Sequence, residues 1–154
     1  VPLLTYKSDY VAIMMADTIL KPYRSSQKKA AYNNVQLPTF LNTMHRQSFD
    51  QATAAVINNK LYPYLRPHTE CVTRLTFFIE FQFTVFTSDA FLCLQKHIGK
   101  HVSEYSGLTA YAMVFNVVCN SSVGILDRHH VGKSIDYVWC MQCAWMCVGV
   151  LVKA

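Results

Sequence analysis

The last third of the chain has the clearest pattern of apolar and polar positions. Two apolar runs, Ala110 to Cys119 and Tyr137 to Val152, flank a short polar segment that holds almost all the charge of this region. β-Branched and aromatic residues dominate both runs, and this composition is typical of strands on a well-covered sheet. We therefore predict two buried strand systems joined by a turn region, with the rest of the chain covering the sheet.

Helical spacing of apolar residues is found earlier in the chain. Ser8-Asp9 offers an N-cap to a predicted helix over roughly Tyr10 to Leu20, which Lys21-Pro22 ends. Ser48-Phe49-Asp50 gives a second capping signal and predicts an amphipathic helix that Pro63 stops. The apolar positions of this second helix are Ala52, Ala55, Val56, Ile57 and Leu61.

The middle of the chain, Cys71 to Phe86, fits two kinds of element. From Phe77 to Val85 the odd positions are apolar and polar residues alternate with them, which predicts a strand. A helix stays open as an alternative because several apolar residues also share a helical face. Ser88-Asp89 then caps a predicted short helix or irregular segment that runs through His101.

These elements predict an α+β fold in which N-terminal helices pack on a C-terminal antiparallel β-sheet. At 154 residues and 52% hydrophobic content, the chain is long enough for one domain with a substantial core. The polar stretch Tyr23 to Asn34 favours a division into an N-terminal helix with a basic polar arm, residues 1–36, and a single α+β domain, residues 37–154. We expect the domain to fold without residues 1–34.

The net charge of +5 is unevenly distributed. Residues 1–48 carry six Lys and Arg against two Asp, whereas residues 49–154 carry eight against seven acidic residues. The basic excess contains no dense block and no nucleic-acid signature, so we interpret it as a solvated face and expect no nucleic acid partner. Six cysteines without a visible secretory signal favour a reducing compartment with free, mostly buried thiols.

The candidate metal ligands are incomplete. Cys140 and Cys143 form a C-x-x-C followed by Cys147, but on a strand Cys140 points away from the other two, so buried thiols are the favoured interpretation. His97 and His101 have the spacing that shares a metal on a helix, yet the H-E-x-x-H motif is absent. We interpret them as an exposed pair and predict no metal site and no cofactor.

The catalytic motifs are incomplete as well. Asp127-Arg128-His129-His130 and Ser121 supply the residue types of a Ser/His/Asp triad, but no nucleophile-elbow glycines accompany them. The favoured interpretation of this segment is a solvated hairpin loop. Gly132-Lys133-Ser134 lacks the upstream glycine of a phosphate loop. No catalytic residue is predicted.

Several short motifs occur in order along residues 35–154. Gln36-Leu37-Pro38 precedes the predicted helix to Leu61, and Glu70 to Phe86 follows it. Ile98-Gly99 and Gly107-Leu108 come next, before the Cys-rich apolar end. In this order the chain resembles a Tctex-type dynein light chain, in which Gln-Leu-x-Pro leads into the first helix of the domain. By that resemblance Glu70 to Phe86 is similar to the second helix of the family, the two glycine pairs to its first strand pair, and the apolar end to its final strand.

The resemblance implies a non-enzymatic adaptor of a microtubule motor complex, located in the cytoplasm, the cytoskeleton or the cilium axoneme. The adaptor would form a homo- or heterodimer and hold an extended segment of a dynein intermediate chain, or another light chain, at a sheet edge. Strand addition of this kind needs no catalytic group. The residues expected to bind partners are Gly107, Leu108, Tyr111, Met113 and Phe115 at the edge and Met14, Met15, Ile19 and Leu20 on the N-terminal helix.

Two other functions stay open. The aromatic residues could line a pocket for a small apolar ligand, in a binding protein or an enzyme. The uncharged segment Tyr137 to Val152 could instead anchor the chain in a membrane, but it is shorter than the about 20 apolar residues that a span needs. We therefore favour the adaptor and expect no membrane partner.

Overall fold

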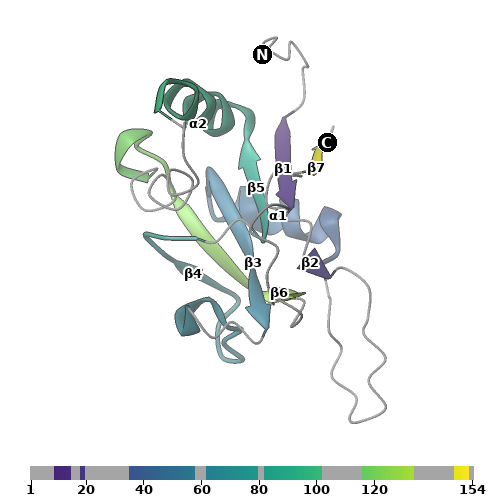
Figure 1. Ribbon diagram of the computed structural model, residues 1–154. Helices are drawn as coiled ribbons and strands as arrows, with labels where there is room; N and C mark the ends of the chain where they lie inside the picture. Colours follow the sequence, from purple (N-terminus) through teal and green to yellow (C-terminus); the bar gives the residue numbers. More distant parts are fainter. Residues whose placement is uncertain are drawn as a thin grey trace, which may run out of the picture.

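The computed structural model describes residues 9–14, 18–19, 35–57, 62–79, 82–101, 116–133 and 148–152 (Figure 1). In these residues one seven-stranded sheet has the order β2-β6-β3-β5-β1-β7, and β4 also pairs with β6. The chain is therefore of the α+β class. The strands are β1 (Tyr10–Met14), β2 (Thr18–Ile19), β3 (Gln51–Ile57), β4 (Thr73–Leu75), β5 (Phe83–Thr87), β6 (Val123–Lys133) and β7 (Val148–Val152), and the helices are α1 (Leu37–Arg46), the 3-10 helix η1 (Pro63–Leu65) and α2 (Ser88–His101).

Helix α1 covers one face of the sheet. Pro38 lies in its first turn, where a missing N–H costs nothing. Phe40 and Met44 are one turn apart and fully buried, and they pack against alternate residues of β3, β5 and β6. The helix ends at Arg46. Ser48, two residues later, has a left-handed φ of 53°, and the N–H of Phe49 donates to the Met44 carbonyl at 3.0 Å.

Helix α2 covers the opposite face, together with η1. Ala90 and Leu94 are also one turn apart, and they pack on Phe86 of β5 and Val123 of β6. The Thr87 hydroxyl accepts a hydrogen bond from the Ala90 N–H at 3.4 Å, which caps the start of the helix. Of the two predictions for the segment through His101, a short helix or an irregular segment, the helix is the correct one. None of the described helices has the length and apolar character needed to cross a membrane.

Two predicted helices are wrong. Tyr10–Met14 is strand β1, which lies between β5 and β7, and Thr18–Ile19 is strand β2. Gln51–Ile57 is strand β3, the strand between β5 and β6. Six of its seven residues are buried, because the small alanines let layers on both faces approach. A strand covered on both faces has a continuous apolar pattern that also satisfies helical spacing.

The predicted order of helices followed by an antiparallel sheet is not found in the described residues. Strand β1 precedes α1, and β3 pairs with β6 in parallel. Val11 and Ala12 of β1 are buried, so the sheet includes residues that we expected to be dispensable. Residues 20–34, which contain most of the predicted basic arm, lie outside the described part of the chain.

The strand interpretation of the middle segment is correct, but its extent is not. Thr73–Leu75 forms β4 and Phe83–Thr87 forms β5, whereas the described residues 76–79 are irregular. In the predicted terminal strands, Val148–Val152 is β7, but residues 116–118 form a helical turn rather than a strand. Residues 102–115 and 134–147 lie outside the described part.

The polar segment predicted to be a hairpin loop is in the interior of β6. Asp127 and His129 are buried there. Ala54 of β3 pairs with Leu126 and the next residue, Ala55, pairs with His130, so residues 127–129 form a bulge. The prediction of a solvated loop is therefore wrong, because the bulge and a distant arginine accommodate polar residues inside a strand.

Candidate partner-binding edge

Strand β4 lies at an open edge of the described sheet. It pairs with β6 in antiparallel register, from Thr73 opposite Leu126 to Leu75 opposite Gly124. On either side of this ladder, the Thr76 N–H donates to the Val123 carbonyl and the Asp127 N–H donates to the Val72 carbonyl, each at 3.0 Å. Even-numbered residues of this segment therefore bond to β6.

The odd-numbered residues of β4 direct their backbone polar groups away from the sheet, because hydrogen bonding alternates along an antiparallel strand. Thr73 and Leu75 each present one N–H and one C=O on this outer side. Within the described residues, no strand pairs with the outer side of β4. The edge can therefore accept a further strand.

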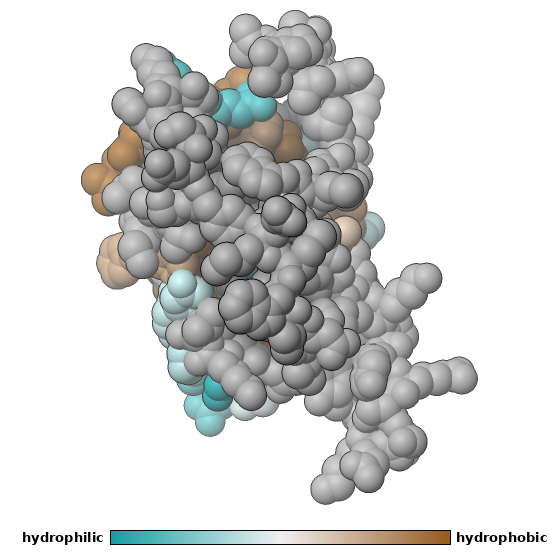
Figure 2. Space-filling view, viewed as in Figure 1, coloured by the Kyte–Doolittle hydropathy of each residue, from teal (hydrophilic) through white to brown (hydrophobic). Residues whose placement is uncertain are grey.

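Large apolar side chains are exposed at and around this edge. Leu75 is 78% exposed and Phe77 is 82% exposed. Val72 and Tyr64 are each exposed by more than two fifths. Val72 and Leu75 are three residues apart and so face opposite sides of the strand, and we call Leu75 and Phe77 alone the edge patch. Figure 2 shows hydrophobic surface along the upper left margin, level with the turn at residues 116–118 in Figure 1, and a smaller area of it level with the end of β4.

A buried ion pair fixes β4 on the sheet. The Arg74 guanidinium donates to both carboxylate oxygens of Asp127, from Nε and from Nη2, each at 2.7 Å. The Asp127 side chain is fully buried and that of Arg74 is 20% exposed. Arg74 also donates to the carbonyls of Tyr64 and Arg66, each at 2.8 Å, and the His68 N–H donates to Asp127 at 2.8 Å. One arginine thus ties β4, β6 and the η1 segment together.

A pocket of about 260 Å³ lies where the β6 bulge approaches α1. In the described part of the chain Val72 is the only aliphatic residue in its lining, and the other lining residues are Gln36, Thr39, Thr43, Arg128 and His129. Polar and apolar atoms both contribute to its surface.

The predicted partner-binding residues are described only in part. Met14 lies in β1 and packs against the α1-side core, and Ile19 lies in β2. Neither is on a helix, so the prediction of an apolar helix face is wrong at these two positions. Their contact with a neighbouring subunit stays a prediction. The remaining predicted residues, Met15, Leu20, Gly107, Leu108, Tyr111, Met113 and Phe115, lie outside the described part.

The residues considered for a catalytic triad have other contacts. The Asp127 carboxylate binds Arg74 and the His68 N–H, and the Ser121 hydroxyl donates to the Cys119 carbonyl at 3.2 Å. The His129 ring lies at the edge of the Phe40 ring, with 5.3 Å between centroids. Residues 140, 143 and 147 of the C-x-x-C region lie outside the described part of the chain.

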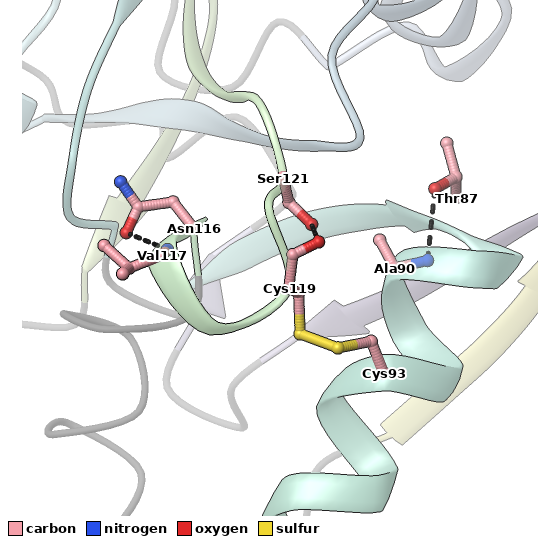
Figure 3. Close-up of a disulfide and its surroundings, with 7 residues drawn as sticks. All are labelled: Thr87, Ala90, Cys93, Asn116, Val117, Cys119 and Ser121. Carbon is pink, nitrogen blue, oxygen red and sulfur yellow. Dashed lines mark hydrogen bonds between the residues drawn. A yellow bond between two sulfur atoms is a disulfide. The ribbon is translucent and has the colours of Figure 1, made fainter.

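The expectation of free thiols is wrong for two of the cysteines. Cys93 of α2 and Cys119 form a disulfide, and Figure 3 shows Cys119 approaching α2 from the turn that follows residues 116–118. Cys71 is free and half-buried. His97, predicted to be one of an exposed pair, is half-buried beside the disulfide, and the side chain of His101 lies outside the described part.

Sequence reasoning missed the edge patch because its signal is weak. Leu75 and Phe77 are apolar residues in a segment that fits a strand, and local sequence does not distinguish an exposed edge from a buried one. The one local signal is Arg74, the single basic residue within that segment, because a lone charge in a strand needs a partner.

No family model, curated protein or solved structure matches this chain.

Proposed function

We propose that the protein is a non-enzymatic adaptor that binds an extended segment of a partner chain along the open edge of β4. The observation that carries this proposal is that no strand of the described residues pairs with the outer backbone groups of Thr73 and Leu75, at an edge where Leu75 and Phe77 are strongly exposed. Proteins usually protect open edges with charges, prolines or bulges, and a bare apolar edge favours association.

The edge defines the chemistry of the partner. An added strand takes its affinity from main-chain hydrogen bonds to Thr73 and Leu75 and its specificity from alternate side chains. Apolar residues at every second position of the partner would contact Leu75 and Phe77. The net charge of +5 favours acidic residues in the partner, since opposite charge speeds association.

The resemblance to Tctex-type dynein light chains supplies a candidate partner, an extended segment of a dynein intermediate chain or another light chain. An adaptor of this class also dimerises, as a homo- or heterodimer. The described sheet ends at β7 on the side away from β4, so pairing there would leave β4 free for the partner. The proposed location is thus a motor complex on microtubules, in the cytoplasm or the cilium axoneme.

The proposal is tested by titrating the full chain with overlapping synthetic peptides that cover a dynein intermediate chain, using fluorescence anisotropy. Leu75→Ala removes an exposed side chain that a partner would bury, so the dissociation constant should rise by about tenfold or more. Leu75→Pro also removes the outward N–H and should abolish binding while the fold is kept, because that N–H does not bond to β6.

The matched control is Leu92→Ser on α2, which removes another apolar side chain, 49% exposed, away from the edge. It should bind as the wild type does. Amide exchange at Thr73 and Leu75 should slow in the complex. Binding that survives Leu75→Pro, or that Leu92→Ser weakens equally, would refute the edge site. If no peptide binds the wild type, the dynein partner is wrong.

A further inference from the structure

A group of potential metal ligands lies at the disulfide, independent of the β4 edge. One ligand atom from each of Cys93, His97 and Cys119 lies within 4.8 Å of the other two. All three side chains are half-buried. In the described residues this is the only group of three or more His, Cys, Asp or Glu side chains with such spacing.

Secondary structure positions the three side chains. Cys93 and His97 are one turn apart on α2, so they lie on the same side of the helix. Cys119 is fixed by the turn around it, in which the Ser121 N–H donates to the Asn116 carbonyl at 2.9 Å and the Ser121 hydroxyl donates to the Cys119 carbonyl (Figure 3). The turn also contains Asn120, with a left-handed φ of 48°. These contacts fix the shape of the turn that carries Cys119, and Cys119 also packs against the core cluster that contains Ala90 and Leu94 of α2.

We propose that reduction of the Cys93–Cys119 disulfide converts this group into a binding site for a thiophilic divalent cation of the zinc class. Two thiolates and one imidazole are ligands that Zn²⁺ prefers, and three protein ligands leave a fourth position for water. The disulfide and the metal site exclude each other, since a sulfur in the disulfide is not a thiolate. The site is therefore gated by redox state.

The geometry is compatible with a tetrahedral ion. With Zn–S bonds of about 2.3 Å, two thiolates on one ion lie about 3.8 Å apart. The Cα atoms of Cys93 and Cys119 are 6.0 Å apart, so after reduction side-chain rotation can separate the sulfurs without moving α2. His97 already lies within the 4.8 Å limit of both sulfurs. Only a short movement is needed to bring all three ligand atoms to one ion.

The chemistry balances in two steps. Two equivalents of a small thiol break the S–S bond, each cysteine sulfur gains an electron and a proton, and the reductant becomes its own disulfide. The cation then replaces the thiol protons, which pass to solvent, and it accepts the lone pair of the neutral His97 ring. Reoxidation would release the ion.

The test uses the full chain, reduced with a phosphine that is then removed, and titrated with Co²⁺ as a spectroscopic probe for Zn²⁺. The reduced protein should bind one Co²⁺ with thiolate charge-transfer absorption and tetrahedral visible bands, and Zn²⁺ should displace it. The oxidised protein should show neither signal from this site. Circular dichroism reports whether the fold survives reduction.

His97→Gln is the decisive variant, because it removes a ligand but leaves the disulfide intact. It should weaken Co²⁺ binding to the reduced protein by about tenfold or more, the scale on which site partners affect metal affinity. The matched control His45→Gln changes an exposed histidine of α1 and should bind as the wild type does. Cys93→Ser/Cys119→Ser should lose the charge-transfer band.

Four outcomes would overturn the proposal. These are equal affinity of His97→Gln and wild type, equal binding by the oxidised protein, a charge-transfer band that survives in Cys93→Ser/Cys119→Ser, and loss of the fold with no binding upon reduction. The third outcome would locate the metal at other cysteines. The last would show that the disulfide acts only as a cross-link.

Discussion

Replacing Arg74 by Met should destabilise the protein by about 3–5 kcal/mol. The substitution keeps much of the apolar side chain and removes the guanidinium that pairs with both oxygens of the fully buried Asp127 carboxylate. A buried charge without its partner costs about that amount, because desolvation is no longer offset. The His68 N–H still donates to Asp127 at 2.8 Å, which favours the lower end of the range.

The measurement is urea unfolding followed by far-ultraviolet circular dichroism, with Arg128→Met as the matched control. Arg128 is the next residue along β6 and is exposed, so its loss should change stability by less than about 0.5 kcal/mol. Arg74→Lys keeps the charge but not the two-pronged geometry, and it should lie between the wild type and Arg74→Met.

A double variant separates the unpaired charge from other effects of the substitution. Arg74→Met/Asp127→Leu removes both charges and should be more stable than Arg74→Met alone, since apolar replacement of a whole buried pair is often neutral. An Arg74→Met protein within about 1 kcal/mol of the wild type, or a double variant less stable than the single one, would refute this reasoning.

Three further outcomes are expected. Gly124→Ala should lower the free energy of unfolding by about 1–3 kcal/mol in thermal unfolding, because a Cβ there would lie 2.6 Å from Cδ2 of Phe49. The same substitution in a Phe49→Leu protein should cost less. Equal costs in both proteins would contradict the overlap. Deleting residues 1–14 should abolish the cooperative melt, since β1 lies inside the sheet, and an unchanged melting temperature would show β1 to be dispensable. Asp50→Ala should lower the free energy of unfolding by about 1–2 kcal/mol, because it removes the acceptor of the Ser122 N–H, at 2.8 Å. Asp50→Asn keeps an oxygen and should cost less. Identical denaturation midpoints of the wild type and Asp50→Ala would exclude that role.

The elements that could be predicted from sequence depend on local signals. Helix α2 has an acidic first turn and buried residues one turn apart, so its bounds follow from a short stretch. Strand β7 lies in an apolar run of strand-forming residues. The α+β class follows from the presence of both kinds of signal.

The elements that were missed depend on distant partners. The alanines of β3 match helical spacing, and only its position between β5 and β6 explains why a strand of such small residues is stable. Asp127 is acceptable inside β6 because Arg74, 53 residues earlier, neutralises it. The β4 edge is a candidate site only because no described strand covers it, which depends on the whole sheet rather than on local sequence.

The bulge in β6 has a consequence for how this protein can change in length. Leu126 before the bulge and Val131 after it both face the α1 side. The residues of β6 that face this side are therefore even-numbered before the bulge and odd-numbered after it. The bulge thus holds three extra residues, an odd number, and the residues after it still pair with β3. A further insertion or deletion of one residue at the bulge can be absorbed in the same way, whereas a change of one residue in the paired part of β6 would exchange its buried and exposed positions. Natural length variation in β6 is therefore expected at the bulge rather than in the paired residues before and after it.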